Sequence, residues 1–176
     1  MHKLLFLAMW VAVGAFAGEV ALDKEAGWIK ARAHATGHEF ETVPQEYEVH
    51  VMLDDAGGLT GATFSCKVMD LTTFKKKRDK EMFHWLESDA HPTLGFTMES
   101  LENRDGAQVM VGSFHLHEMT QKIEVPITLS VNGDAVTLDG SAVLNTETFG
   151  LPIIRKMGFL TVKPEVEVTF HLVGTR

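Results

Sequence analysis

Residues 123–142 read IEVPITLSVNGDAVTLDGSA and decide the fold class of the chain. Apolar side chains occupy every second position from Ile123 to Val131, and the alternation resumes at Val136 after the turn Asn132-Gly133-Asp134. A period of two is typical of a strand with one buried face, and asparagine followed by glycine favours a tight turn between antiparallel strands. The stretch therefore predicts a β-hairpin, and with it an antiparallel sheet.

The same alternation recurs along most of the chain. Turn residues separate the alternating segments, most clearly at residues 54–58 and 104–106. The pattern predicts eight antiparallel strands, at about residues 28–36, 47–53, 62–68 and 94–104, from 109 onward, and at 123–131, 136–142 and 165–172. Eight such strands fit either a barrel or a sandwich, and we expect the barrel because closure leaves no unpaired edge strand.

One segment between the third and fourth predicted strands breaks this pattern. Apolar and charged residues at 74–86 follow helical spacing, which predicts an amphipathic helix that Thr72 or Thr73 caps. Arg78 lies four residues from an apolar position on either side, and hence beside the apolar stripe. Its charge has two alternative partners: a group within the protein, or the acidic head group of a ligand at the barrel mouth.

The segment 149–162 is too apolar for a plain surface loop. Six large apolar residues surround Pro152 and Gly158, namely Leu151, Ile153, Ile154, Met157, Phe159 and Leu160. We expect a plug or lid on one end of the barrel, with a hydrophobic portal for a lipid tail as the functional alternative.

Residues 1–17 have the features of a secretory signal peptide. A short positive start containing Lys3 precedes the apolar run 4–16, which ends in the small residue Ala17. Cleavage near Ala17 would leave residues 18–176 as one mature domain, periplasmic or secreted. A permanent anchor helix is the alternative, but it needs roughly 18 apolar residues or more. We therefore expect no stable membrane anchor.

The composition narrows the classes of function. The chain has 176 residues and a formal net charge of −8, which argues against nucleic-acid binding because the phosphate backbone is also negative. Cys66 is the single cysteine, so no intrachain disulfide and no four-cysteine zinc site can form. Its spacing within a predicted strand indicates a buried thiol. The fold must therefore be stabilised mainly by an apolar core.

Several short motifs stand out along the chain. They are Arg78-Asp79-Lys80-Glu81-Met82, then Trp85-Leu86, His91-Pro92 with Phe96 following, the segment 112–122, and Phe149-Gly150. Together they resemble the YceI-like family of exported, lipocalin-like, polyisoprenoid-binding barrels. Glu118 stands where the family usually has glycine. The resemblance covers about residues 22–172 and implies a lipocalin-like barrel wrapped around an isoprenoid chain, with a helix beside it.

We expect the inward side chains to form a tunnel for an apolar lipid. The residues predicted to line it are Ala33, Phe64, Val68, Phe96, Met98, Val125, Ile127 and Phe170, and Arg78 is expected near the head end. The tunnel is apolar because its lining is, so an elongated apolar molecule is its natural occupant. No cofactor is expected other than a bound isoprenoid lipid or quinone.

A catalytic or metal site is the weaker interpretation. The sequence contains no nucleophile elbow, phosphate-binding loop or H-E-x-x-H helix, so we predict a binding protein and not an enzyme. His115 and His117 would share one face of a strand, with His34, His50 or Glu118 as a third ligand only if the fold brought it near. We expect ordinary strand histidines and no metal.

The predicted function is therefore an exported protein that carries or sequesters a polyprenyl lipid or an isoprenoid quinone. One alternative is a structural or interaction module with a solidly packed barrel and no lipid. Another is a metal-dependent enzyme built on His115 and His117. The sequence leaves the oligomeric state open, with a homodimer as one option.

Overall fold

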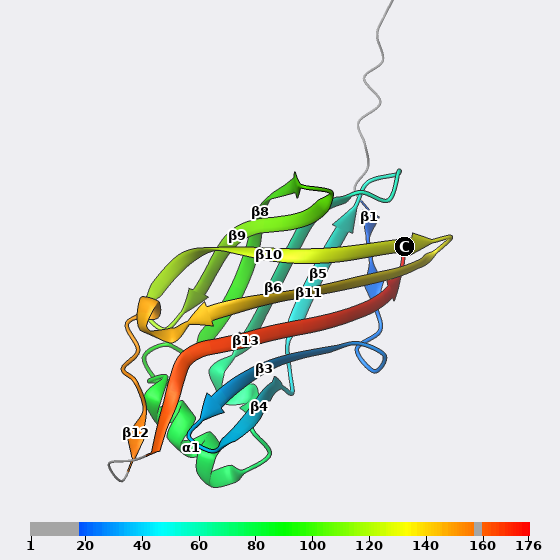
Figure 1. Ribbon diagram of the computed structural model, residues 1–176. Helices are drawn as coiled ribbons and strands as arrows, with labels where there is room; N and C mark the ends of the chain where they lie inside the picture. Colours follow the sequence, from blue (N-terminus) through cyan, green and yellow to red (C-terminus); the bar gives the residue numbers. More distant parts are fainter. Residues whose placement is uncertain (1–17, 157–159) are drawn as a thin grey trace, which may run out of the picture.

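The computed structural model describes residues 18–156 and 160–176. The predicted signal peptide, and Met157, Gly158 and Phe159 of the predicted plug, lie outside the described residues. In the described part, thirteen antiparallel strands form one curled sheet that wraps around a helix and a long connecting segment at its lower end (Figure 1).

Nine strands have six residues or more and build the sheet. They are β3 (Trp28–Ala35), β4 (His38–Pro44), β5 (Glu48–Leu53), β6 (Leu59–Lys67), β8 (Thr93–Arg104), β9 (Ala107–Leu116), β10 (Met119–Asn132), β11 (Ala135–Asn145) and β13 (Leu160–Thr175). Four two-residue strands add to its margins: β1 (Gly18–Glu19), β2 (Ala21–Leu22), β7 (Leu71–Thr72) and β12 (Arg155–Lys156). The helices are α1 (Lys76–Trp85) and the 3₁₀ turns η1 (Val68–Asp70) and η2 (Thr146–Phe149).

The predicted hairpin is confirmed with its register. Strands β10 and β11 pair from Ile127 opposite Gly140 to Asn132 opposite Ala135, so Gly133 and Asp134 form a two-residue turn. Gly133 has φ +62°, a left-handed conformation that glycine adopts without steric cost. The local sequence therefore sets this part of the sheet unaided.

The prediction of eight strands closed into a barrel is wrong in two respects. The sheet runs β1-β5-β6-β8-β9-β10-β11-β13-β3-β4-β7, and within the described residues its two ends do not pair with each other. It is therefore a curled half-barrel. The sequence-based count also omits β4, whose inward positions include polar residues (His38, Thr42) and Pro44, so that apolar alternation is weak there.

Irregular pairing occurs at three places among the described strands. The β5–β6 register shifts between Met52 and Leu53, the β8–β9 register between Met98 and Ser100, and the β13–β3 register between Val162 and Val166. Bulges of this kind increase the local twist and bend of a strand. In Figure 1, β13 bends sharply at its lower end, which carries the sheet around toward α1.

The predicted helix is confirmed, but its start and its cap differ from the prediction. It begins at Lys76 rather than Phe74, Lys75 is the N-cap residue, and no side chain caps it. Thr72 and Thr73 donate instead to the Asp79 carboxylate one turn into the helix. These bonds attach α1 to β7, at the edge of the sheet.

Two apolar clusters fill the concave side of the sheet. The first surrounds Val51, Leu53, Val136 and Leu138, and the second surrounds Phe114 and Phe149 at the end near α1. The buried Cys66 belongs to the second cluster, as the sequence predicts. No helix within the described residues has the length and apolar character needed to cross a membrane.

Candidate functional site

A cavity of about 830 Å³ lies inside the curl of the sheet. Its walls come from the inward faces of both halves of the sheet, with Ala31, Val49, Phe96, Leu138 and Phe170 among the lining residues. The volume falls within the range of ordinary ligand pockets, which are also mostly apolar. The interior of the half-barrel is therefore hollow where the two clusters leave room.

Helix α1 and the segment after η2 form the cavity wall at its lower end. Met82 and Trp85 of α1 and residues 152–155 all line it. The Trp85 indole nitrogen donates to the Pro152 carbonyl at 2.8 Å and joins these two parts of the wall. Phe149 and Leu151 are 1% and 2% exposed and anchor the segment in the second cluster. The described part of segment 149–162 thus forms part of the cavity wall at one end of the half-barrel.

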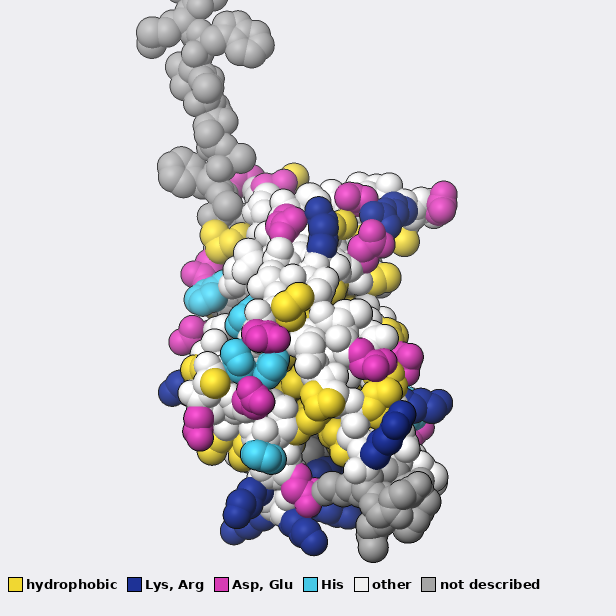
Figure 2. All heavy atoms as spheres, turned by 90° about the vertical axis from the view of Figure 1, so that its left-hand side faces the viewer, with side chains coloured by type: hydrophobic (Ala, Val, Ile, Leu, Met, Phe, Trp, Pro, Cys, Tyr) yellow, Lys and Arg dark blue, Asp and Glu magenta, His cyan; other side chains and the backbone are white. Residues whose placement is uncertain are grey.

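Cationic side chains dominate the charged part of the cavity wall. Among the described side chains, the charged ones that line it are Lys75, Lys77, Arg78, Arg155 and Lys163, together with the Glu81 carboxylate. Figure 2 shows several Lys and Arg side chains at the same lower end of the molecule, with others near the top, and acidic side chains over most of this face. A protein with a net charge of −8 therefore has a locally positive cavity rim.

Arg78 lies at this rim and contacts an aromatic ring. Its guanidinium carbon is 4.4 Å from the centre of the Phe40 ring, within the range of a cation–π interaction. This contact holds the side chain against β4 and leaves guanidinium hydrogen-bond donors at the cavity wall, since Arg78 itself lines the cavity. By contrast, Arg104 far from the rim forms ion pairs with both Glu102 and Glu124.

Six of the nine residues predicted to contact a ligand line the cavity. They are Ala33, Phe64, Arg78, Phe96, Val125 and Phe170. They come from β3, β6, α1, β8, β10 and β13, so the tertiary fold brings together residues from most of the chain.

The other three predicted residues pack in the core instead. Val68 follows the end of β6, lies in η1 and is 1% exposed in the second cluster. Met98 is at the bulge of β8 and packs against the first cluster. Ile127 is 8% exposed and belongs to the first cluster. The Phe170 ring covers the neighbouring Gly140 so closely that a Cβ there would be 2.4 Å from the ring and 3.1 Å from Ile127.

The sequence-based prediction missed the contribution of β4 to the cavity. His38, Phe40, Thr42 and Pro44 all line it, at every second position of that strand. The period of two was present in the sequence, but a mixed polar and apolar face does not stand out as a buried one. The most important residue that the prediction missed is Phe40, because its ring contacts the Arg78 guanidinium.

A model of the YceI-like domain matches residues 13–174 of the chain. The chain belongs to the YceI-like family. The resemblance suggested by the motifs around Arg78-Asp79 and His91-Pro92 is thereby confirmed. No curated protein sequence matches the chain.

Solved structures of other YceI-like and related proteins share this fold. Burkholderia cenocepacia BcnA superposes with a TM-score of 0.77 at 19% identity, covering 88% of this chain and 99% of BcnA. A polyisoprenoid binding domain from Saccharophagus degradans, implicated in plant cell wall breakdown, has a TM-score of 0.67 at 12% identity, covering 92% of this chain and 100% of that domain. The Campylobacter jejuni YCEI protein has a TM-score of 0.63 at 11% identity, with 77% and 84% covered.

In the Arg78-Asp79 motif of this YceI-like chain, Asp79 has a structural role. Asp79 accepts hydrogen bonds from Thr72 Oγ1 at 3.0 Å, from the Thr73 backbone N–H at 2.7 Å and from Thr73 Oγ1 at 2.5 Å. Burial acts to raise the pKa of the Asp79 carboxyl, but these bonds and the Arg78 charge outweigh it and hold the pKa below its ordinary value. The ionised Asp79 therefore fixes α1, and with it one wall of the cavity.

The pairing of His115 with His117 on one strand face is wrong. Strand β9 ends at Leu116, and His117 occupies the turn with φ +56°. His115 is exposed near Thr120, whereas His117 is buried and faces Glu87 and His91. The i, i+2 argument fails because it needs both residues in extended backbone.

Proposed function

We propose that this YceI-like protein is an exported carrier or sequestering protein for an isoprenoid-type lipid, either a polyprenyl lipid or an isoprenoid quinone. The observation that carries the proposal is the apolar cavity of about 830 Å³, lined at one end by α1 and by cationic side chains. Family membership and the structural similarity to the S. degradans polyisoprenoid binding domain support the same class of ligand.

The energetics favour a long apolar chain in this cavity. Each methylene transferred from water to an apolar site contributes about 0.8 kcal/mol, before the costs of ordering the ligand are subtracted. Affinity should therefore rise with the number of isoprene units until the cavity is filled, and stay level for longer chains. A chain-length series of one lipid class measures this directly.

The cationic rim favours an acidic head group at the α1 end. Arg78 is the best-placed donor because Phe40 orients its guanidinium at the cavity wall. The planar guanidinium of arginine can donate two parallel hydrogen bonds to the oxygens of a phosphate group. Of the two lipid types, a polyprenyl phosphate would therefore gain more binding energy from these cationic side chains than a neutral quinone would.

The alternative is a structural or interaction module that carries no lipid. A solidly packed interior would favour it, and the cavity described above counts against that packing. Extraction of the natively exported protein with organic solvent, followed by mass spectrometry, distinguishes the two functions. An isoprenoid present at a fixed ratio to protein supports the carrier, and a lipid-free protein with no saturable isoprenoid uptake refutes it.

A matched pair of variants tests whether isoprenoid uptake requires the cavity. Ala33 is 7% exposed and lines the cavity, so Ala33→Phe introduces a ring into the space a lipid would occupy. Ala107→Phe is the control, because Ala107 is an exposed residue at the start of β9 outside the cavity lining. We expect Ala33→Phe to reduce isoprenoid uptake at least tenfold and Ala107→Phe to leave it unchanged, with circular dichroism checking the fold of both.

A further inference from the structure

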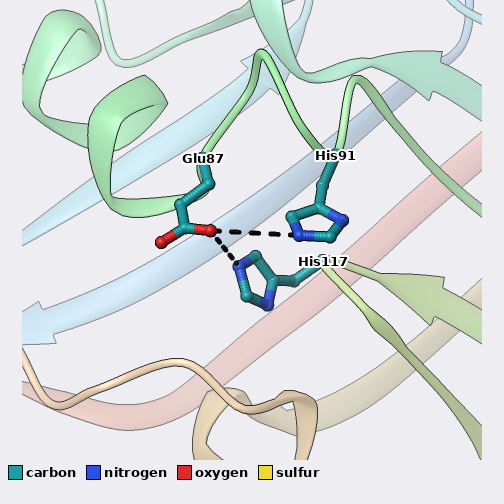
Figure 3. Close-up of side chains that lie close together, drawn as sticks. All are labelled: Glu87, His91 and His117. Atoms are coloured by element: carbon teal, nitrogen blue, oxygen red, sulfur yellow. Dashed lines mark hydrogen bonds and ion pairs between the residues drawn. The ribbon is translucent and has the colours of Figure 1, made fainter.

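Glu87, His91 and His117 form a cluster of metal-ligating side chains outside the cavity. Figure 3 shows the two imidazole rings and the carboxylate directed toward one another. One potential ligand atom from each residue lies within 4.8 Å of those of the other two. None of the three lines the cavity, so the cluster is separate from the proposed lipid site.

The fold brings the three residues together from two distant segments. Glu87 follows the end of α1, and the His91 backbone N–H donates to the Glu87 carbonyl at 2.9 Å, which places both residues in one hydrogen-bonded turn. His117 is at the tip of the β9–β10 hairpin. Glu87 and His117 have φ values of +49° and +56°, so two of the three donors come from backbone that non-glycine residues adopt infrequently.

The distances are close to those of a transition-metal site. His117 Nε2 lies 3.4 Å from Glu87 Oε2, and His91 Nε2 lies 3.9 Å from the same oxygen. Ligand atoms that surround one Zn²⁺ tetrahedrally at 2.0–2.1 Å are about 3.3 Å apart. The His117–Glu87 pair already has this spacing. The Glu87 side chain is 62% exposed and has room to move toward His91.

The contact between His117 and Glu87 is weak for a hydrogen bond. The His117 side chain is 9% exposed, its Nε2 contact to Glu87 is long at 3.4 Å, and its buried Nδ1 has no hydrogen-bond partner within the described residues. Good N–H···O bonds measure 2.7–3.2 Å. A cation between Nε2 and the carboxylate would replace this weak contact with two coordination bonds.

We propose that Glu87, His91 and His117 bind a divalent transition-metal ion of the Zn²⁺ type. Two imidazoles and one carboxylate suit Zn²⁺ and its neighbours, whereas Mg²⁺ and Ca²⁺ favour sites made of oxygen ligands alone. The exposed side of Glu87 leaves a fourth position for water. The ion would link the end of α1 to the β9–β10 turn, adjacent to Leu86 and Leu116, which line the cavity.

The test is metal titration of the purified, tag-free protein after treatment with a chelator. Isothermal titration with Zn²⁺ should give one ion per chain, and Co²⁺ should produce the visible absorption of a site with nitrogen and oxygen ligands. We expect His91→Phe and Glu87→Gln to weaken Zn²⁺ binding at least tenfold. His115→Ala is the matched control: it removes an exposed histidine two residues from His117 and should leave binding unchanged.

Thermal unfolding gives a second measurement that does not depend on the titration. Zn²⁺ should raise the Tm of the wild-type protein and of His115→Ala, but not that of His91→Phe, because only a ligand that binds the native state stabilises it. His91 is 23% exposed and Glu87 62%, so their variants should fold, and far-UV circular dichroism checks that they do. No stoichiometric binding, or binding that survives both His91→Phe and Glu87→Gln, overturns the proposal.

Discussion

Replacement of Asp79 by alanine should destabilise the protein by detaching α1 from the edge of the sheet. The Asp79 carboxylate accepts three hydrogen bonds from Thr72 and Thr73, which are 9% and 4% exposed. In Asp79→Ala these buried donors lose their acceptor. The variant therefore loses favourable bonds and also leaves polar groups unsatisfied.

The expected magnitude follows from those three bonds. A hydrogen bond to a charged group contributes about 1.5–3 kcal/mol, and a buried unsatisfied donor costs about 1–3 kcal/mol. Because the bonds share one carboxylate, their contributions do not add fully. We expect a loss of about 2–4 kcal/mol, which corresponds to roughly 5–15 °C in Tm for a protein of this size.

Urea unfolding followed by circular dichroism measures this loss, and the release rate of bound lipid measures its effect on the cavity. Asp79→Ala should also release lipid faster, since Arg78, Met82 and Trp85 of the same helix line the cavity. Asp89→Ala, at an exposed position after α1, is the control for removing a negative charge. A loss below about 0.5 kcal/mol in Asp79→Ala would refute the proposed attachment, because it is smaller than one ordinary hydrogen bond.

The pH dependence of the same contact has a definite sign. The pKa of the Asp79 carboxyl is lowered in the folded protein, so its ionised form is favoured by folding. Its contribution is fully present above the ordinary pKa of 3.8 and is lost as the pH falls through the lowered value. The stability difference between wild type and Asp79→Ala should therefore be constant near neutral pH and shrink below about pH 4.

Three further predictions concern single residues. Cys66 should not react with a thiol reagent at pH 8 until the protein unfolds, because burial, and then the Asp70 charge, raise its pKa to about 12; fast reaction of the native protein would contradict this. Phe149→Ala should lower the free energy of unfolding by about 3–5 kcal/mol, since the ring is 1% exposed and packs edge-on against Phe114; an unchanged urea midpoint would show that the site collapses without cost. Arg78→Gln should weaken binding of a polyprenyl phosphate more than that of a neutral quinone, and equal effects on both would exclude a role in head-group recognition.

Local sequence predicted much of the secondary structure because strand alternation and turn chemistry act over a few residues. The β10–β11 hairpin, the existence of α1 and the burial of Cys66 all follow from such short-range signals. Strand β4 was missed because its inward face mixes polar and apolar residues. The helix start was misjudged because Thr72 and Thr73 bond to Asp79 rather than capping the first turn.

The sequence by itself determined that this chain is an antiparallel β protein with one helix, an apolar interior and the motifs of the YceI-like family. The tertiary structure decided which apolar residues enclose a cavity and which pack against one another, since that depends on bulges and on neighbours such as the Phe170 ring over Gly140. It also decided that His117 faces Glu87 and His91 rather than sharing a face with His115. These outcomes rest on contacts between residues distant in the chain, which a periodic pattern does not encode.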